Sequence, residues 1–333
     1  MATIRDVALL AGVSTATVSH VLNNTRTVSE VTRDRVVAAM EALGYQPNAV
    51  ARSLRVNETL TIGLILPDVE LPFFAWVAKC IEKVASDLGY NIILCNSGWS
   101  LSRELRYLEN LQTRRVDGLI CISVGLTNEH VAPLLRRHMP VVWFEEARIE
   151  GVSDAVLIDN VRGAYEATRH LVAQGHRRIG CILGYTPTVV TSDRLLGYQH
   201  ALREAGLPFD RTLLCSGDYE APSGLRGARQ LLDLAEPPTA IFAFNDMMAL
   251  GALQVAHERH LRVPDQLALI GFDGIPLTEF MSPSLSTVRQ PIPEMSRIAF
   301  DLLLDRIHDR APNESRTVRV EPVLVPRAST LLV

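Results

Sequence analysis

Polar and aromatic side chains stand directly after several apolar runs in the long second part of this 333-residue chain. They are Phe73, Phe74, Glu145, Glu146, Arg194, Asn245, Asp246, Asp273 and Gln290. In parallel sheets ligands bind beyond the carboxyl ends of the strands, so these side chains can converge on one molecule. Carboxylates, amides and a guanidinium suit vicinal hydroxyl groups, and aromatic rings stack on C–H faces. We expect a polyol site, although a single polar residue at a strand end more often forms a turn.

A second group of short side chains lies near the amino terminus, in a stretch with helical spacing. Its members are Thr15, Ala16, Thr17, Ser19 and His20. Short polar groups that project from one helix can enter a major groove and contact base edges. Ala16 offers only a methyl group, which can touch thymine but makes no directional hydrogen bond. Any small three-helix unit shows similar periodicity, so the pattern alone leaves DNA binding open.

The elements that would hold this second group form a small helical unit. Thr3 followed by Asp6 is typical of a helix cap, and Gly12 favours the left-handed conformation that ends a helix. A second helix is expected from Ser14 and a third over 29–44, as in a helix-turn-helix unit. The segment 49–55 is long enough for two helical turns, and it would need a partner helix or DNA to become ordered.

The second part of the chain alternates short apolar runs with amphipathic stretches. The runs predict strands over 60–66, 91–96, 118–123, 141–144, 179–184, 240–244 and 267–272. The stretches predict helices over 73–88, 101–115, 162–174, 193–205, 223–234, 247–260 and 293–308. This alternation predicts an α/β fold with doubly wound parallel sheets and right-handed crossovers. It is too long for one sheet, so we expect two lobes.

Charge is distributed unevenly along the chain. The net charge is −4, but residues 1–57 hold six arginines against four acidic residues. A mildly basic head on an acidic body can approach phosphates while the body is repelled from them. We divide the chain into a DNA-binding domain at 1–46, a hinge helix and linker at 47–58, and an effector-binding and dimerisation domain at 59–333.

Three stretches carry a resemblance to a known family. Residues 3–8, 11–23 and 45–54 together resemble the headpiece and hinge of the lactose-repressor family, closest to its purine-repressor branch. The resemblance implies that the second helix reads the major groove and that the hinge becomes a minor-groove helix when two subunits meet. It places Leu54 as a wedge between base pairs. The implied DNA-binding residues are Thr15, Ala16, Thr17, His20, Asn23, Arg26, Leu54 and Arg55.

The body resembles the effector domain of the same family and its relatives, the periplasmic sugar-binding proteins. By position, the resemblance implies ligand contacts from Phe73, Phe74, Arg194, Tyr219, Asn245, Asp273 and Gln290, to which we add Glu145 from its place after a strand. The sequence departs from the purine branch at Thr188, Val189 and Val190, and Glu146 stands where that branch has a stacking Trp. These departures argue against a purine corepressor and favour a neutral sugar or a nucleoside-like effector.

Composition and missing motifs narrow the remaining classes. Five widely spaced cysteines indicate neither a disulfide framework nor a zinc cluster. The apolar runs are too short to span a membrane, and the amino terminus has no export-signal pattern, so we expect a cytoplasmic protein. His257 and His260 lack the i, i+4 spacing of a zinc-protease helix, and no nucleophile elbow or phosphate-binding loop is present. We expect no enzyme activity and no cofactor.

The resulting hypothesis is a ligand-responsive transcriptional regulator, most simply a repressor. It would bind a near-palindromic duplex operator as a homodimer or a higher assembly, under control of a small sugar-like effector. Two alternatives remain, a solute-binding protein with no DNA-linked role and a regulator that responds to purines or nucleosides. A sugar-modifying enzyme would require turnover. The sequence names neither the operator nor the effector, and it does not distinguish an inducer from a corepressor.

Overall fold

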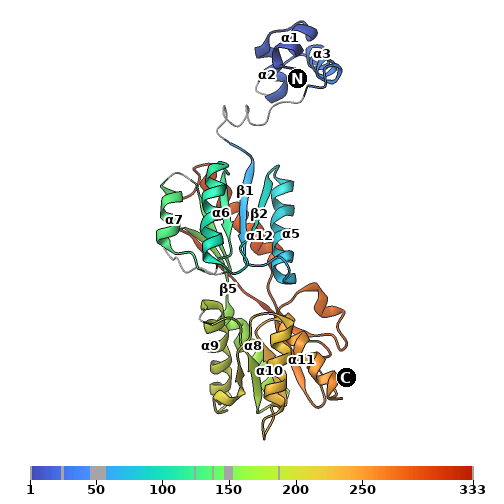
Figure 1. Cartoon of the computed structure of the whole chain (residues 1–333), viewed down its shortest axis with the longest axis vertical. Helices are drawn as coiled ribbons and strands as arrows, with labels where there is room; N and C mark the ends of the chain where they lie inside the picture. Colours follow the sequence, from blue (N-terminus) through green and yellow to red (C-terminus); the bar gives the residue numbers. More distant parts are fainter. Residues whose placement is uncertain are drawn as a thin grey trace. The chain divides into compact units, whose positions relative to one another are not determined.

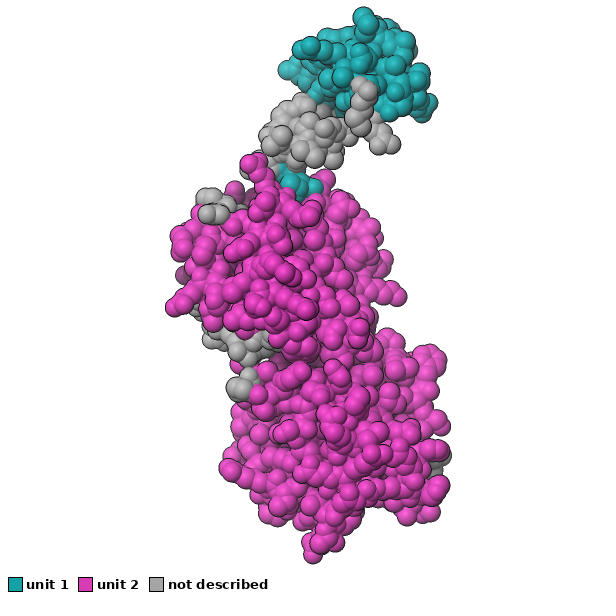
Figure 2. All heavy atoms as spheres, viewed as in Figure 1, with its two compact units in different colours: residues 1–59 teal, residues 60–333 magenta. Residues whose placement is uncertain are grey.

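The chain forms two compact units in the computed structural model, which describes residues 2–23, 26–45, 58–123, 125–136, 139–145, 153–186 and 188–331. The units are the head, Met1–Thr59, and the body, Leu60–Val333, which Figure 2 shows in separate colours. Most of the expected hinge at 47–58 lies outside the described residues, so its helix stays a prediction.

The head holds three helices, α1 (Ile4–Ala11), α2 (Thr15–Asn23) and α3 (Glu30–Ala42) (Figure 1). The predicted cap of α1 is confirmed, because the backbone N–H of Thr3 donates to the Asp6 carboxylate at 2.8 Å and the Thr3 hydroxyl accepts from the Asp6 N–H. Gly12 ends α1 with φ +63°, as its lack of a Cβ allows. Valines from all three helices, including Val7, Val18 and Val36, form a fully buried core.

The first lobe of the body is a six-stranded parallel sheet in the order β11-β5-β4-β3-β1-β2. Its strands are β1 (Thr61–Leu66), β2 (Asn91–Asn96), β3 (Gly118–Cys121), β4 (Val141–Glu145), β5 (Asp154–Ile158) and β11 (Thr317–Val320). Its helices are α5 (Pro72–Asp87), α6 (Leu101–Thr113), α7 (Asn128–Leu135) and α12 (Ile292–Ile307).

Side chains of the central strands alternate between two apolar layers, as the period of two requires. Ile62, Leu64 and Leu66 of β1 pack with α5 and α12. Ile65 of β1 points to the opposite face and packs with residues of α6 and α7. Because both faces are covered by helices, the strands are almost continuously apolar, which is why the sequence pattern revealed them.

The second lobe repeats this plan with the sheet order β12-β10-β9-β8-β6-β7. Its strands are β6 (Ile179–Ile182), β7 (Leu214–Cys215), β8 (Ala240–Ala243), β9 (Ala268–Asp273), β10 (Ser286–Arg289) and the antiparallel β12 (Val323–Val325). Its helices are α8 (Asn160–Ala173), α9 (Val189–Glu204), α10 (Ala221–Leu232) and α11 (Asp246–Glu258). Helix α11 approaches α10 so closely that a Cβ on Gly251 would lie 2.1 Å from the carbonyl oxygen of Ala221.

The chain passes between the two lobes three times. It leaves the first lobe after β5, returns from β10 to α12, and leaves again between β11 and β12. Figure 2 shows the body narrowing between its lobes. Each connecting segment begins at the carboxyl end of β5, β10 or β11. A residue there can contact side chains of both lobes, as Gln290 does with Glu145 and Asp273.

The α/β class with two doubly wound sheets is confirmed, and several elements differ from the prediction. Strands β5, β7, β11 and β12 and helix α7 were not predicted. Helix α9 begins at Val189 instead of residue 193, because the Thr188 hydroxyl accepts a hydrogen bond from the Thr191 N–H at 3.1 Å and caps the helix there. Arg194 therefore lies in the second turn of α9, and the predicted helix over 193–205, which would place it at the start, was wrong at this end.

Candidate functional site

The head presents the predicted reading residues on the outer part of α2. Thr15 and Ala16 are exposed, and His20 is half-buried. The hydroxyl of Thr17 lies 2.9 Å from that of Ser14, and the Ser14 hydroxyl also accepts from the Thr17 N–H at 3.0 Å. Thr17 therefore helps to begin the helix, and Thr15 and Ala16 are the most exposed of the residues predicted to read DNA from α2.

Three predicted DNA contacts have no described side chain. Arg26 is exposed after α2, but the side chain of Asn23 lies outside the described residues, and so do Leu54 and Arg55. The loop between α1 and α2 is fixed by Arg35 of α3, whose guanidinium donates to the carbonyl oxygens of Ala11 and Gly12. This contact sets the corner that determines how α2 projects from the head.

The body encloses a cavity of about 60 Å³ between its two lobes. Seven of the eight predicted effector residues line it, and the eighth, Gln290, hydrogen-bonds to two of them. The cavity is lined by Pro67, Leu71, Phe73, Phe74, Trp99, Ile122, Ser123, Glu145, Thr188, Val190, Arg194, Tyr219, Asn245, Asp246, Met247, Asp273 and Ile275. Apart from Tyr219, which only the family resemblance indicated, these residues were predicted from the rule that ligand residues follow strands, and they come from widely separated parts of the chain.

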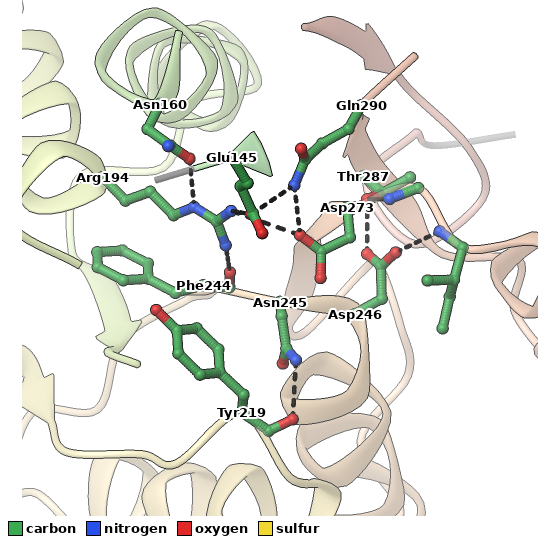
Figure 3. A network of polar contacts seen from close by, with 12 residues as sticks. Glu145, Asn160, Arg194, Tyr219, Phe244, Asn245, Asp246, Asp273, Thr287 and Gln290 are labelled. Carbon is green, nitrogen blue, oxygen red and sulfur yellow. Dashed lines mark hydrogen bonds and ion pairs between the residues drawn. The ribbon is translucent and has the colours of Figure 1, made fainter. Parts of the chain in front are cut away.

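Arg194 is the centre of the polar network in this cavity, and it is almost completely buried (Figure 3). Its Nε donates to Oδ1 of Asn160 at 2.8 Å, and Nη1 donates to the carbonyl oxygen of Phe244. Its guanidinium carbon lies 3.7 Å from the centroid of the Phe272 ring. Buried arginine is stable only when its donors are satisfied, so these contacts hold the guanidinium in one orientation.

Two carboxylates from different lobes meet this guanidinium. Nη2 of Arg194 lies 3.5 Å from Oε1 of Glu145, at the end of β4, and 3.5 Å from Oδ1 of Asp273, at the end of β9. The side-chain amide of Gln290 donates to the same two oxygens at 3.2 and 3.1 Å. Burial raises the pKa of Asp273 well above its usual range, and the neighbouring carboxylates of Asp246 and Glu145 add to this, although Arg194 opposes it.

Asp246 forms the floor of the cavity beneath this cluster. Its Oδ1 accepts from the hydroxyl of Thr287 at 2.5 Å, and its Oδ2 accepts from the backbone N–H of Ile275 at 2.9 Å. Burial raises the pKa of Asp246 to about 7, despite these hydrogen bonds. Both oxygens are used by the protein, so Asp246 fixes the loop after β9 and keeps Asp273 in place.

Asn245 lines the cavity and also stabilises the local fold. Its Oδ1 accepts from the Met248 N–H at 2.8 Å and caps α11, and its Nδ2 donates to the carbonyl oxygen of Tyr219 at 2.8 Å. The Tyr219 hydroxyl lies 2.9 Å from that of Thr191. Asn245 therefore has two roles. It caps α11, as polar residues at strand ends often do, and it positions Tyr219, whose ring lines the cavity.

Backbone strain is concentrated at this cavity. Four of its lining residues have positive φ although none is glycine: Trp99 (58°), Glu145 (70°), Tyr219 (67°) and Asp273 (104°). Each such conformation costs free energy that the surrounding structure must offset, and residues of this kind gather at ligand sites. The strain supports a binding role for the cavity independently of its charges.

The sequence analysis missed Trp99, which lies in the loop after β2. Its ring is 5.9 Å from that of Phe74, 4.8 Å from that of Tyr185 and 6.3 Å from that of Tyr219, centroid to centroid. The contacts with Tyr185 and Tyr219 cross from the first lobe to the second. Trp99 follows the end of a strand like the other residues, so the same rule would have found it. Asp246 was noted only as a strand end, and Asn160 and Thr287 supply supporting contacts that no local pattern indicates.

The described residues hold neither a metal-binding cluster nor a membrane-spanning helix. Among them, no group of three or more histidine, cysteine or acidic side chains is placed to hold a metal ion. No helix in the described ranges is long and apolar enough to cross a membrane.

Comparison with known proteins covers both units of the chain. Residues 3–48 match the model for bacterial regulatory proteins of the lacI family, and residues 168–330 match a periplasmic binding protein-like domain. The chain is 39% identical over 331 residues to the HTH-type transcriptional repressor PurR of Vibrio atlanticus (strain LGP32), covering 99% of this chain and 98% of that protein.

Two solved structures are similar along most of their length. A Lac repressor dimer bound to operator and the anti-inducer ONPF has a TM-score of 0.89 and 29% identity, with 99% of both chains covered. A LacI family transcriptional regulator from Enterococcus faecium with bound ribose has a TM-score of 0.75 and 31% identity, covering 81% of this chain and 98% of that one.

Proposed function

Because this chain belongs to the lacI family of bacterial regulatory proteins, we propose that it is a repressor whose head binds a near-palindromic operator and whose cleft binds a small sugar-like effector. The observation that supports the effector site is the ion pair between Glu145 of the first lobe and Arg194 of the second, which crosses the cavity. An effector that enters there must alter the contact between the lobes. A molecule that stabilises one arrangement of the lobes shifts the population towards it.

The head reads the operator through α2 in this proposal. Thr15 and Ala16 reach the base edges, His20 contacts them from the next turn, and Arg26 binds phosphate. Leu54 acts as the wedge between base pairs, as the family resemblance implies. Each residue gives a testable difference, because a base contact changes specificity while a phosphate contact changes affinity for every sequence.

Homodimerisation is supported by apolar surface on the second lobe. Phe280 is 82% exposed and Leu277 is 44% exposed, although both are large apolar residues. A separate shallow groove between α10 and α11 is lined mainly by apolar side chains, including Pro222, Leu225 and Leu250. A second copy of the chain would cover such surface, and two heads would then match the two halves of a palindrome.

A sugar-like effector is favoured over a purine. The ribose-bound relative has the same fold, and the cavity here joins carboxylates with aromatic rings. The purine alternative is kept open by the identity to PurR proteins, but Thr188 caps α9 at the position where the purine branch holds its ligand. The solute-binding alternative provides no role for the head.

The decisive experiment joins ligand binding to DNA binding. Thermal-shift screening of pentoses, hexoses, nucleosides and purine bases identifies a ligand, and mobility shifts on an operator selected from random DNA measure its effect. We expect the ligand to change operator affinity in wild type. Arg194→Ala should lose this response and still bind the operator, while the control Arg297→Ala, which removes an exposed arginine of α12, should behave as wild type.

A separate arm tests the head. Leu54→Ala should weaken binding to the selected operator more than binding to random duplex. Equal loss on both duplexes contradicts the wedge role, and failure of the whole chain to bind any palindromic site contradicts the repressor proposal in favour of a solute-binding protein.

A further inference from the structure

The cavity between the lobes is small compared with the molecules that its lining suits. It encloses about 60 Å³, whereas sites that hold a small organic molecule usually enclose about 300–1,000 Å³. Its walls come from both lobes, with Phe73 and Phe74 in the first and Arg194 and Tyr219 in the second. A sugar ring can therefore enter only after the side chains that join the lobes have moved apart.

One ion pair joins the lobes inside this cavity. Nη2 of Arg194, on α9 of the second lobe, lies 3.5 Å from Oε1 of Glu145, at the end of β4 in the first lobe. Asp273 lies equally close to the same nitrogen, but burial raises the pKa of Asp273 well above its usual range, so it is largely protonated near neutral pH. Glu145 is therefore the main anionic partner of Arg194, and it comes from the opposite lobe.

The surroundings of this pair strengthen it. The side chains of Arg194 and Glu145 are only 2% and 9% exposed, so salt and water screen their attraction little. The side-chain amide of Gln290 donates to the same Glu145 oxygen at 3.2 Å and to Oδ1 of Asp273 at 3.1 Å, and so joins the two lobes a second time. Separation of the lobes would leave a buried charge without its partner.

Aromatic rings also join the lobes. The ring of Trp99, in the first lobe, lies 4.8 Å from that of Tyr185 and 6.3 Å from that of Tyr219, both in the second lobe. Trp99 is half-buried, and Tyr185 is 37% exposed. The side chains of the protein itself thus hold the lobes together through one charged contact and one aromatic contact.

We propose that the Glu145–Arg194 pair is an internal latch that competes with the effector. The pair holds the lobes together, and an effector opens the cleft by replacing Glu145 at the Arg194 guanidinium. The inference rests on the proposed role of the cleft as the effector site, and it adds how that site is regulated. A variant that lacks the latch should therefore reproduce the effect of the effector on DNA binding.

The connection between the latch and the head follows from the order of the chain. Strand β1 of the first lobe begins at Thr61, close in sequence to the end of the head at Thr59. The exposed apolar residues Leu277 and Phe280, which are proposed to face a second copy, belong to the second lobe. When the second lobes hold a dimer together, opening of each cleft moves the two points from which the heads extend. The latch then controls how well two heads fit the halves of a palindrome.

Glu145→Gln tests the latch without any added ligand. The variant keeps the shape of the side chain, and a neutral amide is a weaker partner for a guanidinium than a carboxylate. The affinity of the full-length protein for the selected operator should change about tenfold. The matched control is Glu109→Gln, which removes an exposed acid of α6 in the same lobe and should bind as wild type. An unchanged operator affinity in Glu145→Gln overturns the latch.

Acrylamide quenching shows whether the lobes separate. In a Trp76→Phe background the remaining tryptophans are Trp99 and the buried Trp143. Without the latch, Trp99 should lose its contacts with the second lobe, so acrylamide should quench Glu145→Gln more strongly than wild type. Quenching of Glu109→Gln should match wild type. Equal quenching in all three proteins shows that the lobes stay together without the pair, and it overturns the latch.

Glu145→Gly provides a second variant if Glu145→Gln does not fold. Glu145 has a positive φ of 70°, which glycine adopts without strain, so this variant removes the carboxylate and relieves the backbone at the same position. Its operator affinity and its quenching should change in the same directions as those of Glu145→Gln. A folded Glu145→Gly protein that matches wild type in both measurements overturns the proposal.

Ligands then separate this inference from the proposed function. A pentose, hexose, nucleoside or purine base that binds wild type should shift its operator affinity in the same direction as Glu145→Gln, and should shift the variant less. A shift in the opposite direction shows that the compound closes the cleft, which overturns the latch while the effector-controlled repressor stands. If wild type binds no palindromic duplex, the proposed function is wrong, and the quenching comparison alone decides whether the latch exists.

Discussion

Trp99 of the first lobe and Tyr219 of the second face each other across the cavity with their rings only 16° from parallel and their centroids 6.3 Å apart. Each residue has positive φ, so each ring is presented by a strained backbone. The pair is an interlobe contact made of side chains alone, and a ligand that enters the cavity must change it.

Trp99 should therefore act as a reporter of ligand binding. Trp76 lies on α5 and Trp143 is buried in β4, so of the three tryptophans only Trp99 lines the cavity. We expect a ligand that stabilises the protein in thermal shift to change intrinsic fluorescence, and Trp99→Phe to lose most of this change. Trp76→Phe is the control and should keep it. An equal signal in the Trp99→Phe protein would place the ligand elsewhere.

The stability of the body should depend on pH through Asp246. Its pKa is about 7 in the folded protein against an ordinary 3.8, so the folded state binds more protons between these values and its stability falls as pH rises. Asp246→Asn cannot titrate. The melting temperature of the variant minus that of wild type should therefore rise between about pH 5 and about pH 8.

Other groups near Asp246 affect this measurement in known directions. The titration of Asp273 also lowers the stability of the folded protein as pH rises, because burial raises its pKa too. Arg327 acts in the opposite direction, since its positive charge lowers the pKa of Asp246. Subtracting the two melting curves removes contributions common to both proteins. A difference that is flat across the pH range would show that Asp246 is charged throughout it.

Asp154 should be a major contributor to the stability of the first lobe. Its carboxylate is fully buried and lies 2.7 Å from both Arg306 of α12 and Arg316 before β11. Burial raises the pKa of Asp154, but these hydrogen bonds outweigh it and hold the pKa below its usual value. Asp154→Asn should lower the free energy of unfolding by about 3 kcal/mol in urea at neutral pH, because it leaves two arginines without their main partner.

The control for Asp154 is Asp301→Asn, which breaks an exposed pair with Arg297 and should cost about 0.5 kcal/mol or less. The pKa of Asp154 is lowered, so its stabilisation is present above its unfolded pKa and is lost as pH falls through its folded pKa. The gap between wild type and Asp154→Asn should thus close in acid. A gap that persists there would indicate a packing role.

The contact between α10 and α11 should not tolerate a methyl group. A Cβ at Gly251 would lie 2.1 Å from the Ala221 carbonyl oxygen and 2.6 Å from the Leu225 nitrogen, and these backbone atoms move only if the helices separate. Gly251→Ala should cost about 3 kcal/mol in urea unfolding. A Cβ at Gly227 would meet side-chain carbons of Ile182 at 3.2 Å and the Cβ of Cys215 at 3.3 Å, which have to move by only a few tenths of an ångström. Gly227→Ala should therefore cost clearly less than Gly251→Ala, and similar losses for both would contradict this account.

Sequence reasoning succeeded where one residue type decides the structure. Gly12 and the Thr3 cap defined the head, and apolar strands covered on both faces revealed most of the sheets. It failed at β5, which opens with the buried Asp154, and at β11, whose outer residues are exposed on a sheet edge. Partners distant in sequence determine both strands, and a local pattern does not contain them.

The sequence predicted which residues would line the cavity, but it did not predict the contacts that these residues make with one another. Seven of the eight predicted residues line the cavity, and Gln290 hydrogen-bonds to two of them. Tyr219 was predicted from the family resemblance alone, whereas the others were predicted because parallel strands bring their carboxyl ends to one edge. The sequence did not indicate that Asn160 and the Phe244 carbonyl would hold the Arg194 guanidinium in one orientation. That property depends on packing between α8, α9 and β8.

The last passage of the chain between the lobes has a consequence for synthesis on the ribosome. Strand β11 borders β5 in the first lobe and β12 borders β10 in the second, so each sheet is completed only after all its other strands have been synthesised. A nascent chain stopped before Thr317 leaves β5 and β10 as bare edges open to aggregation, while the head is already made. A chain that stops just before Thr317 would thus lack an edge strand in both lobes of the body, while the three helices of the head are complete.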